Sequence, residues 1–161
     1  MKILILYRSH YGNTKKVAEA IASAIRDSGH ETEVQDLRRR IPDLAAFGAV
    51  FVGAPTRMAR VTGRAKRVLK ALKKKGFTGP VAVFDTYGPV PAKPEELEKA
   101  HKWLFPGAAG IMQALGTQLG LNIYAEALRC EVQSGMKGPL KDGETGKAAA
   151  FAKKFISVIR K

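Results

Sequence analysis

Short aliphatic runs alternate with segments of helical periodicity from one end of the sequence to the other. Runs with strand character occupy 2–7, 31–37, 49–53, 80–84 and 122–132. Apolar residues recur at helical spacing in the stretch that ends at Gly29, and again at 63–75, 95–104, 108–119 and 144–160. This alternation predicts an α/β fold in which a doubly wound, five-stranded parallel sheet carries helices on both faces. The expected strand order is 2-1-3-4-5, with the polar run 31–37 at a sheet edge.

Length and composition fit a single domain, 1–161. Of the 161 residues, 45% are apolar, and no aliphatic run approaches the ~20 residues that span a bilayer. The N-terminal run lacks a small-residue cleavage pattern, so we expect a first strand and cytoplasmic residence. The lone cysteine, Cys130, excludes an internal disulfide, and the three histidines are too scattered for a metal site. Cys130 lies in an apolar strand, where we expect it to be inert.

The segment after the first strand has the composition of an anion-binding loop. Its small, hydroxyl, amide and aromatic side chains are Ser9, His10, Tyr11, Gly12, Asn13 and Thr14. Backbone N–H groups in such a loop, with the positive end of the following helix, hold a phosphate without needing a lysine. The endings typical of nucleoside triphosphate and dinucleotide loops are absent. We expect a phosphate monoester, although Asn13 also suits an ordinary helix cap.

The pattern Ser9-x-x-Gly12-Asn13-Thr14 after a first strand resembles the phosphate loop of the flavodoxin family, which binds FMN. The family pattern is Ser/Thr-x-Thr-Gly-Asn-Thr, and Tyr11 replaces its second threonine. The resemblance implies a flavodoxin-like fold and an FMN phosphate held by the remaining polar side chains and backbone amides. The histidine of the loop either adds a donor or faces solvent.

Two later segments resemble the loops that flank the flavin ring. Residues 53–58 are similar to the Gly-x-Pro-Thr segment beside the isoalloxazine ring in flavodoxin-like proteins. Its candidate contacts are Pro55, Thr56, Arg57 and Met58. Residues 85–89 resemble the Ser-Tyr-Gly-Trp loop in the flavodoxin-like domain of A-type flavoproteins. Its candidates are Asp85, Thr86, Tyr87 and Gly88. The resemblance implies that Tyr87 packs against the flavin, while Trp103 either caps it or packs under the proline-rich connection.

The chain is strongly basic, with 28 Lys and Arg against 14 Asp and Glu and a formal charge of +14. Nine basic residues and no acidic one lie between 55 and 84: Arg57, Arg60, Arg64, Lys66, Arg67, Lys70, Lys73, Lys74 and Lys75. A solvated helix face is the ordinary explanation. A positive field beside the ring would also stabilise anionic reduced flavin, giving a less negative midpoint potential than acidic flavodoxins have. The charge further predicts an acidic redox partner, a ferredoxin or an oxidoreductase, with salt-sensitive association.

Three functions fit these features. The resemblance implies an FMN-binding electron carrier between redox proteins. An FMN-dependent NAD(P)H/quinone-type oxidoreductase uses the same kind of fold. A nucleic-acid or anionic-surface binder accounts for the charge, but it leaves the phosphate loop unexplained and lacks interleaved aromatic residues. Flavin chemistry requires no catalytic dyad, and the sequence offers none. We favour the electron carrier, with the oxidoreductase as the alternative.

Overall fold

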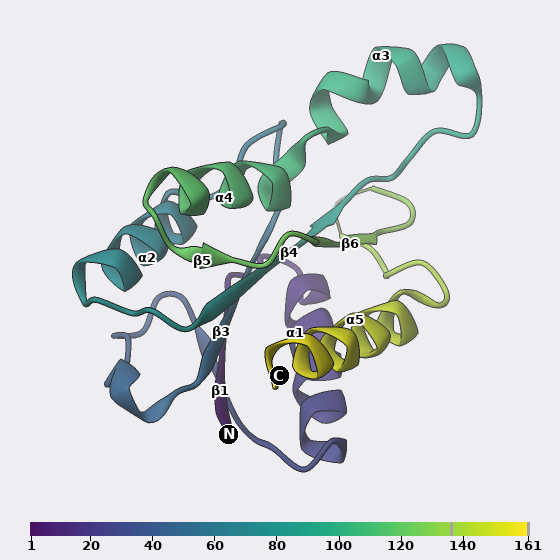
Figure 1. Cartoon of the computed structure of the whole chain (residues 1–161). Coiled ribbons are helices and arrows are strands. Elements are labelled where there is room, and N and C mark those ends of the chain that lie inside the picture. The colour runs from purple at the N-terminus through teal and green to yellow at the C-terminus, as the bar shows by residue number, and fades with distance from the viewer. Residues whose placement is uncertain (136, 161) are drawn as a thin grey trace.

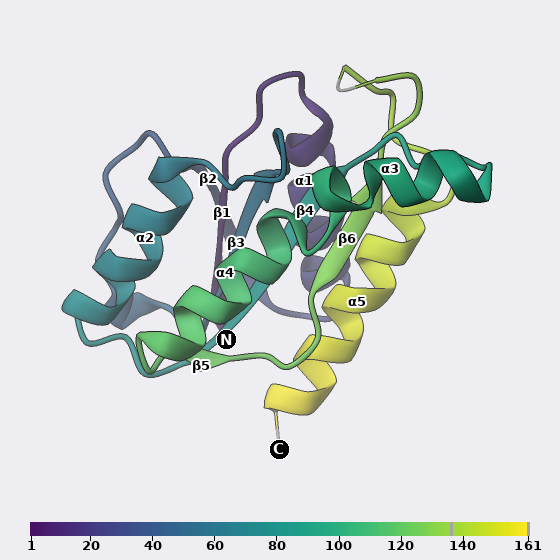
Figure 2. The same ribbon diagram turned by 90° about the horizontal axis from the view of Figure 1, so that it is seen from above.

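The computed structural model describes residues 1–135 and 137–160. Figures 1 and 2 show one sheet with helices on both of its faces. The strands are β1 (Lys2–Tyr7), β2 (Glu31–Asp36), β3 (Ala49–Pro55), β4 (Pro80–Tyr87), β5 (Asn122–Ile123) and β6 (Leu128–Glu131). The helices are α1 (Asn13–Asp27), α2 (Gly63–Lys74), α3 (Pro94–Leu104), α4 (Gly107–Gln118) and α5 (Glu144–Ile159), with a short 3-10 turn η1 (Leu44–Ala46).

The sheet has the order β2-β1-β3-β4-β5, and β6 also pairs with β4. All of these pairings are parallel. The predicted order 2-1-3-4-5 is therefore confirmed, as is the edge position of β2, which pairs with β1 alone. The carboxyl ends of the parallel strands meet at one edge of the sheet, where this topology places its ligands.

The fifth strand is interrupted, which the sequence did not predict. The expected strand 122–132 divides into β5 and β6, and both pair with β4. Between them the Tyr124 ring packs against Phe151 and Phe155 of α5, at centroid distances of 5.8 and 5.1 Å. The Gln113 side-chain amide donates to the carbonyls of Tyr124 and Ala125 at 3.4 and 3.0 Å. These contacts draw the chain out of the sheet between 124 and 127.

Strands β3 and β4 run further toward the site than predicted. We expected them to end at 53 and 84, but the ladder continues to Pro55, which pairs with Thr86. Beyond it, the Thr56 N–H donates to the Thr86 carbonyl at 2.8 Å. The residues from Asp85 to Tyr87 therefore lie on a strand end, where successive side chains point to opposite faces of the sheet.

Alternation along the strands builds two separate core layers. Ile3, Ile5 and Phe51 face α1 and α5, whereas Leu4 and Leu6 face α2 and α4. All five side chains are fully buried. Burying each one stabilises the fold by roughly 1.5–3 kcal/mol relative to leaving it exposed. The two layers fix the sheet between its helices and thereby fix the strand ends.

Helix α3 differs from the other long helices because it is barely packed. Leu104, at its end, is its one buried residue, and Figure 1 shows the helix projecting from the body. Pro94 opens it and Glu95 and Glu96 occupy its first turn, both favourable at a helix N-terminus. The helix stands beside the carboxyl ends of β3 and β4 in Figure 2.

Within residues 1–135 and 137–160 the structure has neither a membrane-spanning helix nor a cluster of metal ligands. No helix in these ranges is long and apolar enough to cross a membrane. No group of three or more His, Cys, Asp and Glu side chains there is arranged to hold a metal ion.

Candidate functional site

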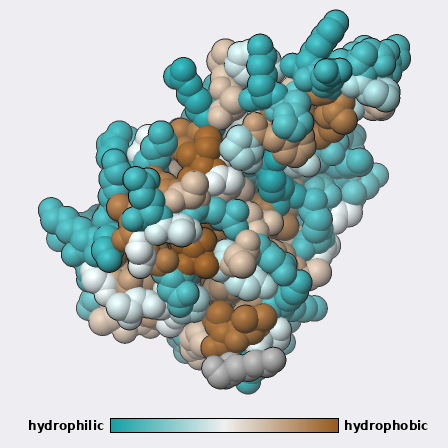
Figure 3. Space-filling model, turned by 45° about the horizontal axis from the view of Figure 1, so that its top comes forward, coloured by the Kyte–Doolittle hydropathy of each residue, from teal (hydrophilic) through white to brown (hydrophobic). Residues whose placement is uncertain are grey.

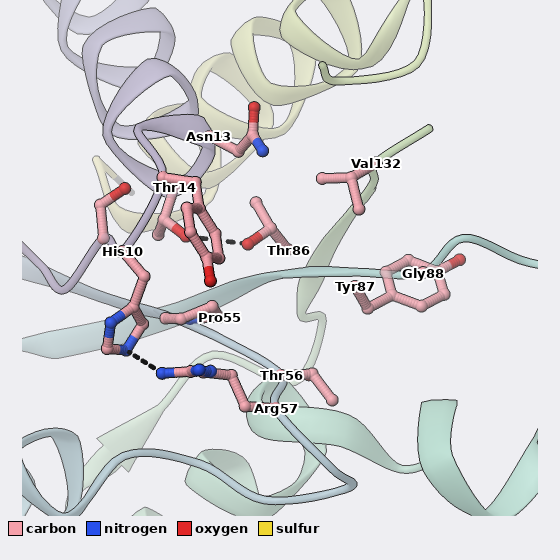
Figure 4. A pocket seen from close by; sticks show the side chains of 12 residues that line it. His10, Asn13, Thr14, Pro55, Thr56, Arg57, Thr86, Tyr87, Gly88 and Val132 are labelled. Carbon is pink, nitrogen blue, oxygen red and sulfur yellow. Dashed lines mark hydrogen bonds between the residues drawn. The ribbon is translucent and has the colours of Figure 1, made fainter. Parts of the chain in front are cut away.

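The segments that follow β1, β3, β4 and β6 enclose a depression at the carboxyl edge of the sheet (Figure 4). It contains about 370 Å³ of unfilled space, part of it open to solvent. Its walls are Ser9, His10, Tyr11, Asn13, Thr14, Pro55, Thr56, Arg57, Thr86, Tyr87, Gly88 and Val132. The structure thus brings together all but three of the candidates predicted from the sequence. The three candidates that do not line the depression are Gly12, Met58 and Asp85. Val132 lines it although the sequence did not predict it as a site residue.

The N-terminus of α1 opens into this depression without a side-chain cap. Gly12 is the N-cap residue, in the left-handed conformation at φ 92°. Because glycine has no side chain, it provides no side-chain cap to the first turn. Ser9 instead stabilises the loop, because its Oγ accepts a hydrogen bond from the Gly12 N–H at 3.0 Å. The first turn also carries no acidic residue. Its N–H groups lack intrahelical acceptors and remain available to an anion.

Asn13, the first residue of α1, carries a buried amide at the rim of the depression. Its side chain is 6% exposed, and its Nδ2 finds no hydrogen-bond partner among the described residues. The backbone of Gly138 presses against it, since a Cβ at Gly138 would lie 2.3 Å from this nitrogen. An unpaired buried donor costs roughly 1–3 kcal/mol. The ordinary role as a helix cap does not apply, because Gly12 holds that position.

Two threonine hydroxyls form the floor of the depression, between the start of α1 and the end of β4. The Oγ1 atoms of Thr14 and Thr86 lie 2.8 Å apart, and both residues are buried. Figure 4 shows them meeting beneath the depression. The pair joins the start of α1 to the end of β4.

The mouth of the depression is electropositive. The Arg57 guanidinium donates to Nε2 of His10 at 3.3 Å. Burial, and then the positive charges of Arg57, Arg8 and Arg38, lower the pKa of His10 from its usual value. His10 is therefore neutral at pH 7. Sequence reasoning did not assign Arg8 or Arg38 to the site, although Arg8 directly precedes the loop and Arg38 lies two residues after β2, whose carboxyl end is at this same edge.

Asp85 lies behind the depression in a buried ion pair. Its carboxylate accepts hydrogen bonds from the Thr56 hydroxyl at 2.8 Å, the Ala109 N–H at 3.1 Å and Arg129 Nε at 3.0 Å. The Thr56 Oγ1 in turn accepts from the Ala108 N–H at 2.7 Å. Burial raises the pKa of Asp85, and these donors oppose the rise. The structure places Asp85, predicted as a flavin contact, where it fixes Thr56 and caps α4.

Tyr87 lines the wall with one side already covered. The Arg129 guanidinium carbon lies 3.8 Å from its ring centroid, and the Phe105 ring packs edge-on at 6.0 Å. Burial raises the pKa of Tyr87, so the phenol is neutral. Arg129 and Phe105 thus cover part of the Tyr87 ring, and Tyr87 also lines the depression.

Met58 and Trp103 lie next to the depression rather than in it. Both line two neighbouring hollows, one shared with His10 and Arg57 and the other shared with Thr56. The structure therefore places Trp103 beside the site. The sequence also allowed Trp103 to pack beneath the proline-rich connection, but a residue that is 47% exposed does not fit that alternative.

The chain is similar to known proteins in sequence and in structure. A family model described as a flavodoxin domain matches residues 4–120. An NAD(P)H dehydrogenase (quinone) from Gluconacetobacter diazotrophicus is 29% identical over 84 residues, which cover 39% of this chain and 42% of the relative. The chain thus spans less than half the length of the curated relatives that it matches.

Two solved structures share the fold. A flavodoxin from the domain Archaea superimposes with a TM-score of 0.77 at 20% identity, covering 100% of both chains. The rubredoxin oxygen:oxidoreductase of Desulfovibrio gigas superimposes with a TM-score of 0.69 at 18% identity, covering 99% of this chain and 36% of the other. The family match covers most of the sequence, and it agrees with the strand order and with the uncapped start of α1 after β1. The chain belongs to the flavodoxin family.

Proposed function

We propose that this protein binds FMN in the depression at the carboxyl edge of the sheet and carries electrons between redox proteins. The observation that carries the proposal is the uncapped start of α1, with the orphaned Asn13 Nδ2 beside it. A phosphate oxygen would accept from these donors and complete their hydrogen bonding. Pro55, Thr56 and Arg57 on one side and Tyr87 and Gly88 on the other would flank the ring.

FMN, when bound, supplies the ability to pass one or two electrons, and the protein's part is to hold and tune it. Thr56 is positioned for this task because Asp85 and the Ala108 N–H both bond its hydroxyl. Arg57 makes the mouth of the depression positive, and the neutral His10 accepts a hydrogen bond from it. A positive mouth favours the more negatively charged, reduced form of the cofactor.

The first test is a titration of the purified protein with FMN and with riboflavin. We expect FMN to bind with quenching of its fluorescence and a shifted visible spectrum. Riboflavin lacks the phosphate and should bind more weakly. A charged hydrogen bond contributes about 1.5–3 kcal/mol, so the loss should be tenfold or more. The absence of any flavin binding would refute the proposal.

A matched pair of substitutions localises the phosphate. Asn13→Asp places a carboxylate where the phosphate would bind, and it should weaken FMN at least tenfold while leaving riboflavin binding little changed. Asn122→Asp makes the same change at an exposed position at the start of β5, on the opposite edge of the sheet. It should leave both affinities unchanged. Equal losses for FMN and riboflavin would show that the phosphate does not bind at Asn13.

The positive mouth also supports our proposal of a less negative midpoint potential than acidic flavodoxins have. Arg57, on the wall of the depression, and Arg60, in the neighbouring hollow, are both exposed. Potentiometric titration of Arg57→Gln and Arg60→Gln should show a lower potential than the unaltered protein. A potential unchanged in both variants would show that these charges do not tune the cofactor.

A second function, reduction of a quinone by NAD(P)H, is favoured by one observation. The hollow beside the depression has apolar walls at Met58, Val61 and Trp103, which would accept a planar substrate. The curated relatives are named NAD(P)H dehydrogenase (quinone). Steady-state oxidation of NADH or NADPH with a quinone, in the presence of FMN, separates the two functions. An electron carrier should show no saturable turnover.

A further inference from the structure

An apolar platform adjoins the site on the side of α3. Met58 is 72% exposed and Trp103 is 47% exposed, and both line the same two hollows. Val61 lies at the base of the first hollow. Thr56 and Gly88 line the second hollow and also the main depression. We call Met58, Val61 and Trp103 the platform. It is continuous with the place where the flavin ring would lie.

Met58 lies at the tip of a tight, hydrogen-bonded turn. The Arg57 N–H donates to the Arg60 carbonyl at 3.0 Å, and the Arg60 N–H donates to the Arg57 carbonyl at 2.9 Å. Between them Met58 and Ala59 have φ values of 50° and 64°, a region that side chains other than glycine seldom adopt. Such strained residues cluster at functional sites such as ligand clamps. The turn leaves the Met58 side chain exposed to solvent.

Trp103 is held from the other side. Its neighbour Leu104 is buried, and the Leu104 carbonyl accepts a hydrogen bond from Arg129 Nη2 at 2.7 Å. The Lys102 ammonium lies 5.1 Å from the centroid of the Trp103 ring. The backbone next to Trp103 is therefore anchored, and a positive charge lies over its ring.

Positive charges surround the platform. Arg57, Arg60, Arg64 and Lys102 are all exposed around it, and the sequence has no acidic residue between 55 and 84. Figure 3 shows a few hydrophobic residues among mainly hydrophilic ones at the surface in the region of α3. Trp, Met and Arg are the residue types enriched in the buried centres of protein interfaces. A basic rim selects an acidic partner.

We propose that the platform is the docking site of an acidic redox protein, which places an exposed apolar side chain on Met58 and Trp103 and its carboxylates against the arginine rim. This inference rests on the proposed electron-carrier function, because the platform adjoins the ring site. Docking there would bring the partner's redox centre close to the flavin. The apolar centre would hold the complex, and the rim would guide its formation.

The test uses an acidic plant-type [2Fe–2S] ferredoxin as the probe. Stopped-flow absorbance would follow electron transfer from the reduced ferredoxin to the FMN-loaded protein at several salt concentrations. Equilibrium binding of the oxidised ferredoxin to the protein without flavin gives a second readout. FMN affinity is measured separately for each variant, so a failure of the proposed function is seen before any ferredoxin is added.

We expect Met58→Ala and Trp103→Ala each to weaken ferredoxin binding and electron transfer about tenfold. Val158→Ala, on α5, removes an apolar side chain of similar exposure, 46%, and should change neither. Unaltered ferredoxin binding in both platform variants would overturn the proposal. A variant that loses FMN affinity but keeps ferredoxin binding would also overturn it, because that residue would then be a flavin contact.

A second pair of variants tests the rim. Arg60→Glu should weaken ferredoxin binding at least tenfold at low salt and flatten its salt dependence. Lys74→Glu makes an equal change of charge about 15 Å along the axis of α2 from Arg64, and its effect should be severalfold smaller. Equal losses in the two variants, or ferredoxin binding that does not depend on salt, would show that net charge or another surface governs association.

Discussion

Asp85→Asn should destabilise the fold more than the removal of a charge from any exposed side chain. The Asp85 carboxylate is fully buried and is bonded by Thr56, Ala109 and Arg129. The substitution keeps the shape of the side chain but leaves the Arg129 guanidinium, only 18% exposed, without its counter-charge. Breaking a buried ion pair in this way costs about 3–5 kcal/mol. That is a large part of the ~5–15 kcal/mol that stabilises a typical domain.

Urea denaturation followed by far-ultraviolet circular dichroism measures the loss. With a slope of about 2 kcal/mol per M, the midpoint should fall by about 2 M. Glu126→Gln is the matched control, since its carboxylate pairs with Lys154 at 2.6 Å but both side chains are about half exposed. Such a pair contributes about 0–1 kcal/mol.

Adding Arg129→Met to the Asp85→Asn variant should cost less than the sum of the two single losses. The reason is that each single change already breaks the ion pair and leaves one buried group without its partner. A midpoint for Asp85→Asn no lower than that of Glu126→Gln would refute the reasoning. Additive losses would show that Asp85 and Arg129 act independently.

Three further outcomes are expected. His10 should titrate below pH 6.5 by NMR in the free protein, since burial and nearby arginines lower its pKa, and bound FMN phosphate should raise that pKa; an unchanged pKa would place the phosphate elsewhere. Gly53→Ala should cost at least about 1–3 kcal/mol, because the new Cβ would lie 2.1 Å from the Phe84 ring. Gly146→Ala, where α5 leaves open space, should instead raise the melting temperature; equal effects would contradict the packing argument. Burial raises the pKa of Cys130 to about 12, so this thiol should react with a maleimide only in denaturant, and rapid labelling of the folded protein would contradict its burial.

The sheet order could be predicted from local patterns, but the break in its last strand could not. Residues 122–132 have the composition of one strand. Whether they stay in the sheet depends on Tyr124 finding Phe151 and Phe155 on a helix at the far end of the chain. Periodicity reports which side of an element is apolar, and it says nothing of such distant partners.

The site was predictable where it consists of consecutive loop residues. The segment 9–14 could be found because its hydroxyl and amide side chains adjoin one another in the sequence. Asp85 was placed at the ring because it follows the fourth strand, but its partner Arg129 is 44 residues away. Arg38, which lies near His10, was missed for the same reason. The assignments of Asp85 and Arg38 need the strand register, whereas Arg8 directly precedes the loop in the sequence.

The hydrogen bonds of Arg129 also connect the site to the single tryptophan, whose fluorescence can therefore respond to binding. Through Asp85 the guanidinium is linked to Thr56 in the depression, and through the Leu104 carbonyl it is linked to the end of α3. Trp103 stands next to that carbonyl and is the single tryptophan of the chain. Its emission therefore comes from one known place. A ligand that shifts Thr56, or a protein that covers the indole, should change the colour or intensity of the emitted light without any attached dye.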